Sequence, residues 1–156
     1  MYIKKYLICM ALLAFILTGC GLKNTHMDIR NSSFLTQNFC HEYSYGNISR
    51  GPNYEQAFYW CSRSSNDNIA SGHVLLAELY LMGNYVAQDF EKARNLYRLA
   101  AQQDHPHAQF MMYQIYSLGL GTDINEQEAL SWLKVAAENG SEHAEKELGL
   151  RIRDMD

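Results

Sequence analysis

The apolar positions of this chain recur with a period of 36 residues. Residues 89–101 (DFEKARNLYRLAA) align at that spacing with residues 125–137 and with residues 53–65. The middle copy carries apolar or small residues at i, i+3, i+4, i+7 and i+8, which are Ala93, Leu96, Tyr97, Ala100 and Ala101. Because this spacing places them on one face of a helix, we expect each copy to form an amphipathic α-helix.

The ends of these helices are also marked in the sequence. Asn53, Asp89 and Asn125 open the three copies, and a short side-chain oxygen at that position can accept from the free amides of the first turn. Gly140 after Asn139 suits the left-handed residue that closes a helix. The copies are therefore predicted as complete helices with defined starts.

A leading helix is expected before each copy, at residues 34–45, 69–82 and 105–118, the last beginning near Pro106. Residues 141–153 repeat only the start of a unit and are expected to form a closing helix, because a solenoid end needs a polar outer face. The pattern predicts an all-α fold, an α-solenoid of about three helix-turn-helix repeats plus a C-terminal capping helix, in a domain spanning residues 34–153.

The first twenty residues have the form of a secretory signal. Two lysines precede a run from Leu7 to Leu17 that is almost wholly apolar and too short to span hydrocarbon, which needs roughly 20 residues. The run ends in Leu-Thr-Gly-Cys, which resembles a bacterial lipobox. The resemblance implies removal of residues 1–19 and lipidation of Cys20, followed by a polar tether over residues 20–33. Gly21, where an Asp would retain such a lipoprotein in the inner membrane, favours a lipid anchor at the periplasmic face of the outer membrane.

Charge and cysteine content narrow the function classes. The 13 basic and 17 acidic residues give a net charge of −4, which excludes a nucleic-acid binder that works by bulk charge. Of the four cysteines, Cys9 leaves with the signal and Cys20 takes the lipid, so Cys40 and Cys61 remain. An oxidising periplasm favours a disulfide between these two. Their repeat equivalents are apolar, so two buried free thiols are the alternative.

The sequence predicts no catalytic residue, cofactor or metal. His41 follows Cys40, but adjacent residues on a helix point about 100° apart, so the histidine is not placed to activate the thiol. His107 and His143 share one repeat position, and neighbouring helices lie about 10 Å apart, too far for both to bind one zinc ion. No phosphate-binding loop or hydrolase motif occurs.

The repeat resembles the Sel-one-like repeat, a relative of the tetratricopeptide repeat. The resemblance rests on the Tyr and Gly that end the leading helix (Tyr80 and Gly83 in the middle unit), the cap, and the Ala100-Ala101 pair, and it covers residues 34–150. In the first unit Ser64-Ser65 replace the alanine pair and Asn47 replaces the glycine. The resemblance implies a protein-binding adaptor with no shared catalytic residues.

In repeats of this type the leading helices line the concave side, where a protein partner would bind. The 36-residue register assigns nine outward positions there: Asn38, Glu42, Tyr45, Val74, Glu78, Leu81, Phe110, Gln114 and Ser117. The strip has two carboxylates and no lysine or arginine, which suits a protein with basic and apolar contacts rather than nucleic acid.

The chain is also similar to small lipoproteins of this design that act as immunity proteins against toxins delivered into the periplasm, for example by type VI secretion. We therefore expect a membrane-anchored periplasmic adaptor of this kind. An envelope-assembly scaffold is the alternative, and a β-lactam or peptidoglycan hydrolase is a further one.

Overall fold

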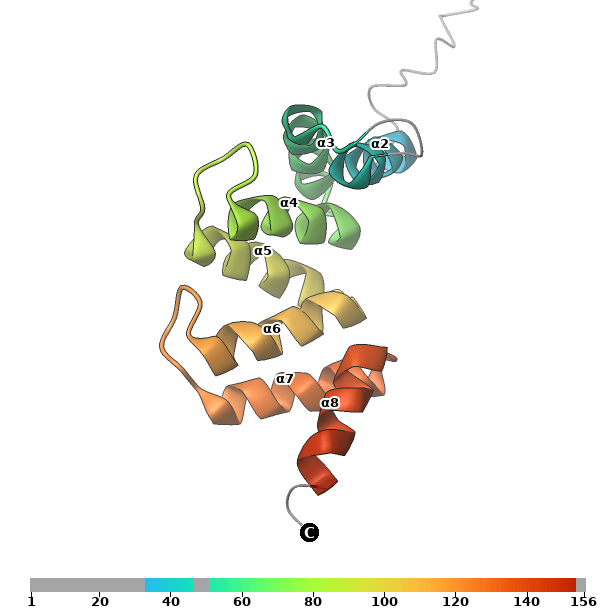
Figure 1. Cartoon of the computed structure of the whole chain (residues 1–156). Helices are drawn as coiled ribbons and strands as arrows, with labels where there is room; N and C mark the ends of the chain where they lie inside the picture. Colours follow the sequence, from blue (N-terminus) through green and yellow to red (C-terminus); the bar gives the residue numbers. More distant parts are fainter. Residues whose placement is uncertain (1–32, 47–50, 154–156) are drawn as a thin grey trace, which may run out of the picture. The chain divides into compact units, whose positions relative to one another are not determined.

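The computed structural model describes residues 33–46 and 51–153, and every regular element within them is an α-helix. In chain order the helices are α2 (Ser33–Tyr45), α3 (Tyr54–Asn66), α4 (Ala70–Met82), α5 (Phe90–Ala101), α6 (Pro106–Leu118), α7 (Glu126–Glu138) and α8 (Glu142–Arg153). Each helix packs against the next one in sequence, α2 also contacts α4, and α4 to α7 lie side by side (Figure 1). This arrangement confirms the predicted all-α solenoid of helix-turn-helix repeats.

The second helix of every unit begins at the predicted cap. The side chains of Asn53, Asp89 and Asn125 each accept a hydrogen bond from the backbone N–H three residues later, at 2.9 to 3.1 Å. Their own backbone N–H groups donate to the carbonyls of Tyr43, Tyr80 and Tyr116, all at 2.9 Å. One residue therefore both starts the second helix and ties it to the first.

The leading helices end in a left-handed glycine. Gly46, Gly83 and Gly119 follow α2, α4 and α6 with φ values of 75°, 71° and 68°, which an L-residue adopts only with strain. The first of them stands 37 residues before the second, although the second and third are 36 apart. The end of α2 is thus displaced by one residue from the sequence register, and Gly46 fills the place that the register gives to position 47.

Three clusters of buried side chains form the core, one at each contact between successive units. The cluster of α4, α5 and α6 is built around Tyr97 and Met112, and that of α6, α7 and α8 around Leu133. The cluster of α2, α3 and α4 is built around Cys40 and Cys61. The cysteines therefore occupy core positions in the first unit, as their apolar repeat equivalents predict.

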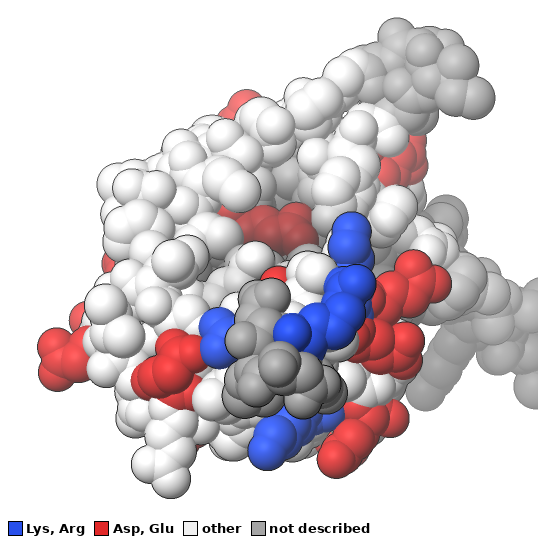
Figure 2. All heavy atoms as spheres, turned by 60° about the horizontal axis from the view of Figure 1, so that its bottom comes forward, with Lys and Arg blue, Asp and Glu red and all other residues white. Residues whose placement is uncertain are grey.

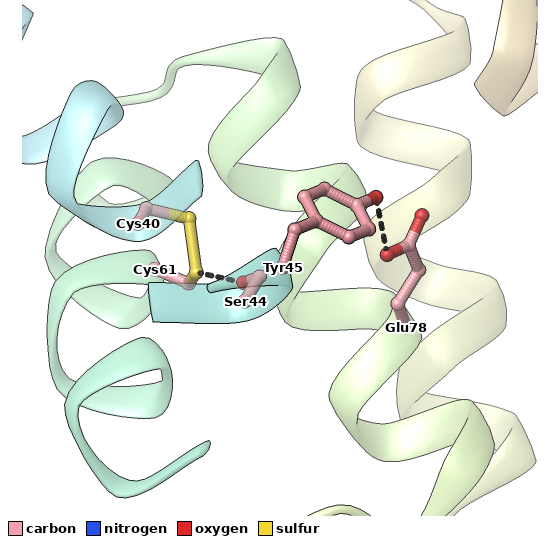
Figure 3. The surroundings of a disulfide bond; sticks show 5 residues. All are labelled: Cys40, Ser44, Tyr45, Cys61 and Glu78. Carbon is pink, nitrogen blue, oxygen red and sulfur yellow. Dashed lines mark hydrogen bonds between the residues drawn. A yellow bond between two sulfur atoms is a disulfide. The ribbon is translucent and has the colours of Figure 1, made fainter. Parts of the chain in front are cut away.

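Cys40 of α2 and Cys61 of α3 form a disulfide, and both residues are fully buried (Figure 3). Their Cα atoms lie 4.7 Å apart. The bridge is the predicted pairing, and the alternative of two free thiols is wrong.

The first unit contains a second adjustment, between α3 and α4. Ser64 stands where the other units have Ala100 and Ala136, and Gly72 stands opposite it where they have Ala108. A Cβ atom on Gly72 would lie 2.4 Å from the Ser64 hydroxyl oxygen and 2.7 Å from the Ser64 backbone carbonyl carbon. The larger serine is therefore accommodated by the smaller glycine at the same contact.

Within residues 33–46 and 51–153, no helix has the length and apolar character needed to cross a membrane. The predicted signal, the lipidation site Cys20 and the tether lie outside the described residues.

Candidate binding groove

A groove of about 310 Å³ opens between the leading helices of the three units. Ser44 and Tyr45 of α2, most of one side of α4, and His107 and Met111 of α6 line it, with Tyr97 of α5 behind them. Its full lining is Ser44, Tyr45, Tyr54, Leu75, Glu78, Leu79, Leu81, Met82, Asn84, Tyr97, His107 and Met111. We call this surface the groove.

Glu78 is the only carboxylate in the lining. Its Oε2 accepts a hydrogen bond from the Tyr45 hydroxyl at 3.0 Å, and Figure 3 shows the Tyr45 ring reaching from α2 toward α4. Its Oε1 lies 3.6 Å from Nε2 of His107. Partial burial, the neighbouring carboxylate charge and this hydrogen bond together raise the pKa of Tyr45 to about 12, so Tyr45 is a neutral donor at physiological pH.

Tyr97 adds a polar group to the wall of the groove. Its side chain is fully buried, and its hydroxyl has no hydrogen-bond partner among the described residues. Burial, and then the charge of Glu78 and the proximity of Tyr45, raise the pKa of Tyr97. The core position predicted for Tyr97 is confirmed, and its hydroxyl is a donor and acceptor that no described residue uses.

Positive charge is segregated away from the leading helices. No Lys or Arg occurs in α2, α4 or α6, whereas α3, α5, α7 and α8 carry all those of the described range. These are Arg63, Lys92, Arg94, Arg98, Lys134, Lys146, Arg151 and Arg153. Figure 2 turns the α8 end toward the reader, and there Lys and Arg gather beside acidic side chains while much of the remaining visible surface is uncharged. The leading helices thus offer the carboxylates of Glu42 and Glu78 without a lysine or arginine on the same helices.

The nine outward positions predicted from the register overlap the groove only in part. Tyr45, Glu78 and Leu81 line it. Asn38 and Glu42 are exposed on α2, outside the lining, and three further residues are half-buried on α6, also outside it: Phe110, Gln114 and Ser117.

Val74 is wrong as an outward position. It is only 5% exposed and belongs to the core cluster of α4, α5 and α6. Residues 72–77 are buried without interruption, because the first half of α4 is enclosed on all sides and has no solvent-facing stripe. After its first two residues, α4 has no solvent-accessible position until Glu78.

The sequence register missed an exposed apolar row at the ends of the leading helices, two members of which, Tyr45 and Met82, line the groove. Tyr45, Met82 and Leu118 are each the last residue of a leading helix, and they are 56%, 65% and 65% exposed. The register paired Tyr45 with Leu81 and Ser117 instead, because α2 is displaced by one residue. The left-handed glycine after each helix is the signal that identifies the row.

The histidines have separate surroundings. His107 faces Glu78, whereas the His143 ring stacks on Phe110 with centroids 5.7 Å apart. Nδ1 of His105 caps α6 by accepting from the Ala108 N–H at 3.4 Å. Within the described residues no group of three His, Cys, Asp or Glu is arranged to hold a metal ion. The Cys40 sulfur is committed to its disulfide, so it offers no thiolate for nucleophilic chemistry.

Comparison with known proteins places this architecture among helical repeats. The family model of the Sel1 repeat matches residues 39–68, 70–105 and 106–141, together more than half of the chain. An uncharacterized protein of Neisseria meningitidis serogroup B is 34% identical over 87 residues, which are 56% of this chain and 18% of that protein.

Solved structures show the same fold. A Sel1 repeat protein from Oxalobacter formigenes superposes with a TM-score of 0.73 and 26% identity, over 81% of this chain and 51% of that one. A protective antigen of uropathogenic Escherichia coli with an SLR fold superposes with a TM-score of 0.68 and 26% identity. The match covers 75% of this chain and 25% of that protein. Cysteine rich protein B of Helicobacter pylori superposes with a TM-score of 0.59 and 21% identity, over 80% of this chain and 97% of that one. This match shows likeness of fold alone. The chain therefore spans about half the length of the Oxalobacter protein and a quarter of the length of the antigen.

Proposed function

Because the chain belongs to the Sel1 repeat family, whose fold is a scaffold for protein interaction, we propose that its groove binds a protein partner and performs no reaction on it. The observation that carries the proposal is the groove itself. It joins exposed apolar side chains to a single half-buried carboxylate, across three helices that hold no Lys or Arg. Apolar surface rimmed by a few polar groups is typical of protein-binding sites.

Site-specific photo-crosslinking of the full-length, membrane-tethered protein tests this proposal. A photoreactive residue replaces Met82, which is 65% exposed in the groove, and in a matched variant it replaces Ile124, which is 68% exposed outside it. We expect a discrete protein adduct from position 82 and none from position 124. Equal labelling from the two positions, or no adduct from position 82, would contradict groove-mediated binding.

We further propose that the protein acts in the periplasm, anchored to the outer membrane by lipid on Cys20. The lipobox-like Leu-Thr-Gly-Cys at residues 17–20 supports the anchor. The Cys40–Cys61 bridge supports an oxidising compartment, since disulfides are rare in the cytosol. Cys20→Ala should release the protein from membranes into the soluble fraction, and a variant that stays in the membrane fraction contradicts the assignment.

The more specific role that we propose is that of an immunity protein, which neutralises a secreted toxin by occupying it in the periplasm. A toxin encoded beside this gene should bind the protein about one to one and be lethal in the periplasm unless the protein is present. Met82→Glu should abolish rescue because it replaces an exposed apolar contact of the groove by a charged, hydrated side chain, whereas Ile124→Glu should rescue like the wild type. Rescue by both variants would show that the groove is not needed to neutralise the toxin. Co-purification with envelope-assembly machinery without any toxin would favour the scaffold role.

A further inference from the structure

We propose that the groove recognises a basic side chain, arginine or lysine, in an apolar segment of its protein partner, with Glu78 as the counter-charge. This inference deepens the proposed function and depends on it. It assigns the chemistry of the partner residue that enters the groove.

Glu78 has unused acceptor capacity in this position. Among the described residues it accepts one hydrogen bond, from Tyr45, and the Nε2 of His107 at 3.6 Å lies beyond hydrogen-bond distance. An ionised carboxylate has about four lone-pair sites and can accept two parallel bonds from a guanidinium. The Glu78 side chain is 27% exposed, so an entering cation can reach it while much of its surroundings stays dry. Partial exclusion of water strengthens the attraction between the two charges.

The Tyr97 hydroxyl is the second, independent sign of a missing partner. It belongs to a fully buried side chain that lines the groove together with Glu78, and no described residue hydrogen-bonds to it. Buried polar groups in folded proteins are normally hydrogen-bonded. The N–H group of a cation bound to Glu78 would supply a donor to this oxygen.

The surroundings of the carboxylate fit the stem of such a residue. Leu81, Met82 and Met111 provide apolar walls around Glu78, and Lys and Arg pack their methylene stems on apolar surface while their heads meet a charge. The Tyr45 ring beside the carboxylate offers a face on which a guanidinium can stack. A volume of about 310 Å³ is at the low end for sites that enclose whole small molecules, and it suits one long side chain with its neighbours.

The charge distribution disfavours the opposite chemistry, an acidic partner residue. Because α2, α4 and α6 contain no Lys or Arg, an acidic residue entering the groove would meet Glu78 without a compensating lysine or arginine from these helices. Like charges brought together at an interface are disfavoured.

Selection of displayed peptides on the full-length protein tests the assignment. A library of random nine-residue peptides is selected on wild-type protein, and the enriched peptides are measured against variants with unchanged helix content by circular dichroism. We expect Arg or Lys at one position with apolar neighbours. Binding should weaken at least tenfold in Glu78→Gln and about fivefold in Tyr97→Phe, as expected for lost hydrogen bonds to a charged group. Glu42→Gln removes the same charge from α2 outside the groove and should leave binding unchanged.

The outcomes separate the two proposals. Peptides that lose binding in Met82→Glu but carry no basic position, or that keep a basic position and bind Glu78→Gln like the wild type, overturn the basic-side-chain assignment and leave the groove as a binding site. A selection in which no peptide depends on Met82 overturns both proposals.

Discussion

Two glycines within helices, Gly72 in the first turn of α4 and Gly149 in α8, should respond in opposite ways to the same substitution. Gly72→Ala adds a methyl group that would lie 2.4 Å from the Ser64 hydroxyl oxygen, 2.6 Å from its Cβ and 2.7 Å from its carbonyl carbon. The backbone atom cannot rotate away, so α3 and α4 must move apart. Overpacking of this kind costs about 1–3 kcal/mol, against a helix-propensity gain of up to about 1 kcal/mol. We expect a net loss of about 1–2 kcal/mol in the free energy of unfolding.

Gly149→Ala is the matched control on α8. A Cβ atom there would meet nothing within 4 Å, so only the propensity gain remains. This variant should be more stable by about 0.5–1 kcal/mol. Urea unfolding followed by circular dichroism measures both variants under one protocol.

The Ser64→Ala background locates the cause of the loss. The Ser64 hydroxyl is buried without a hydrogen-bond partner among the described residues, so its removal alone should be nearly neutral. Gly72→Ala should cost less in that background because the shortest contact has gone, but the backbone contact should keep the cost above zero. Equal or greater stability of Gly72→Ala in the wild-type background would refute the steric argument, and equal costs in the two backgrounds would refute the role of the hydroxyl.

Three further measurements test the fold and the groove. Replacing Cys40 and Cys61 by alanine should lower the free energy of unfolding in urea by about 3 kcal/mol, since the bridge closes a loop across 21 positions. A reductant should lower the free energy of unfolding of the wild type but not that of the alanine variant. The phenol of Tyr45 should titrate by ultraviolet absorbance near pH 12, and Glu78→Gln should lower that midpoint; because the pKa is raised from 10.0 in the folded protein, this group makes stability fall as pH rises between these values. Asn125→Ala should cost about 1 kcal/mol in thermal unfolding, while Asn125→Asp should cost little because it keeps the capping oxygen.

The helices were predictable because their signals are local. Periodicity of apolar residues, a polar cap and a terminal glycine all act within a few residues, and the predicted bounds of α2, α4, α6 and α8 lie within one residue of those observed. The disulfide was predictable from its repeat equivalents, since two core positions of one unit face the same seam.

The groove was less predictable because it depends on contacts between units. The meeting of Tyr45, Glu78 and His107 joins three helices, and no periodicity within one helix reports it. The shift of one residue at the end of α2 is small in the sequence, yet adjacent positions on a helix point about 100° apart, so the register aligns Tyr45 with the wrong residues of α4 and α6. The register therefore predicted the core positions of the later units correctly but assigned the wrong residues to the exposed row. The residues of that row are the last ones of their helices.

The first unit departs from the repeat in ways that act together on the groove. In a repeat array each unit contacts only its neighbours, so the end unit is held by one interface instead of two. Here α2 is bonded to α3 by the disulfide, while Ser64 and Gly72 set the close approach of α3 to α4. The Cys40 bridge lies five residues before Tyr45 on the same helix, so it fixes the helix that delivers the Tyr45 hydroxyl to Glu78. The end unit, which has one neighbour, is thus held together internally by a covalent bond, and one wall of the groove depends on that bond.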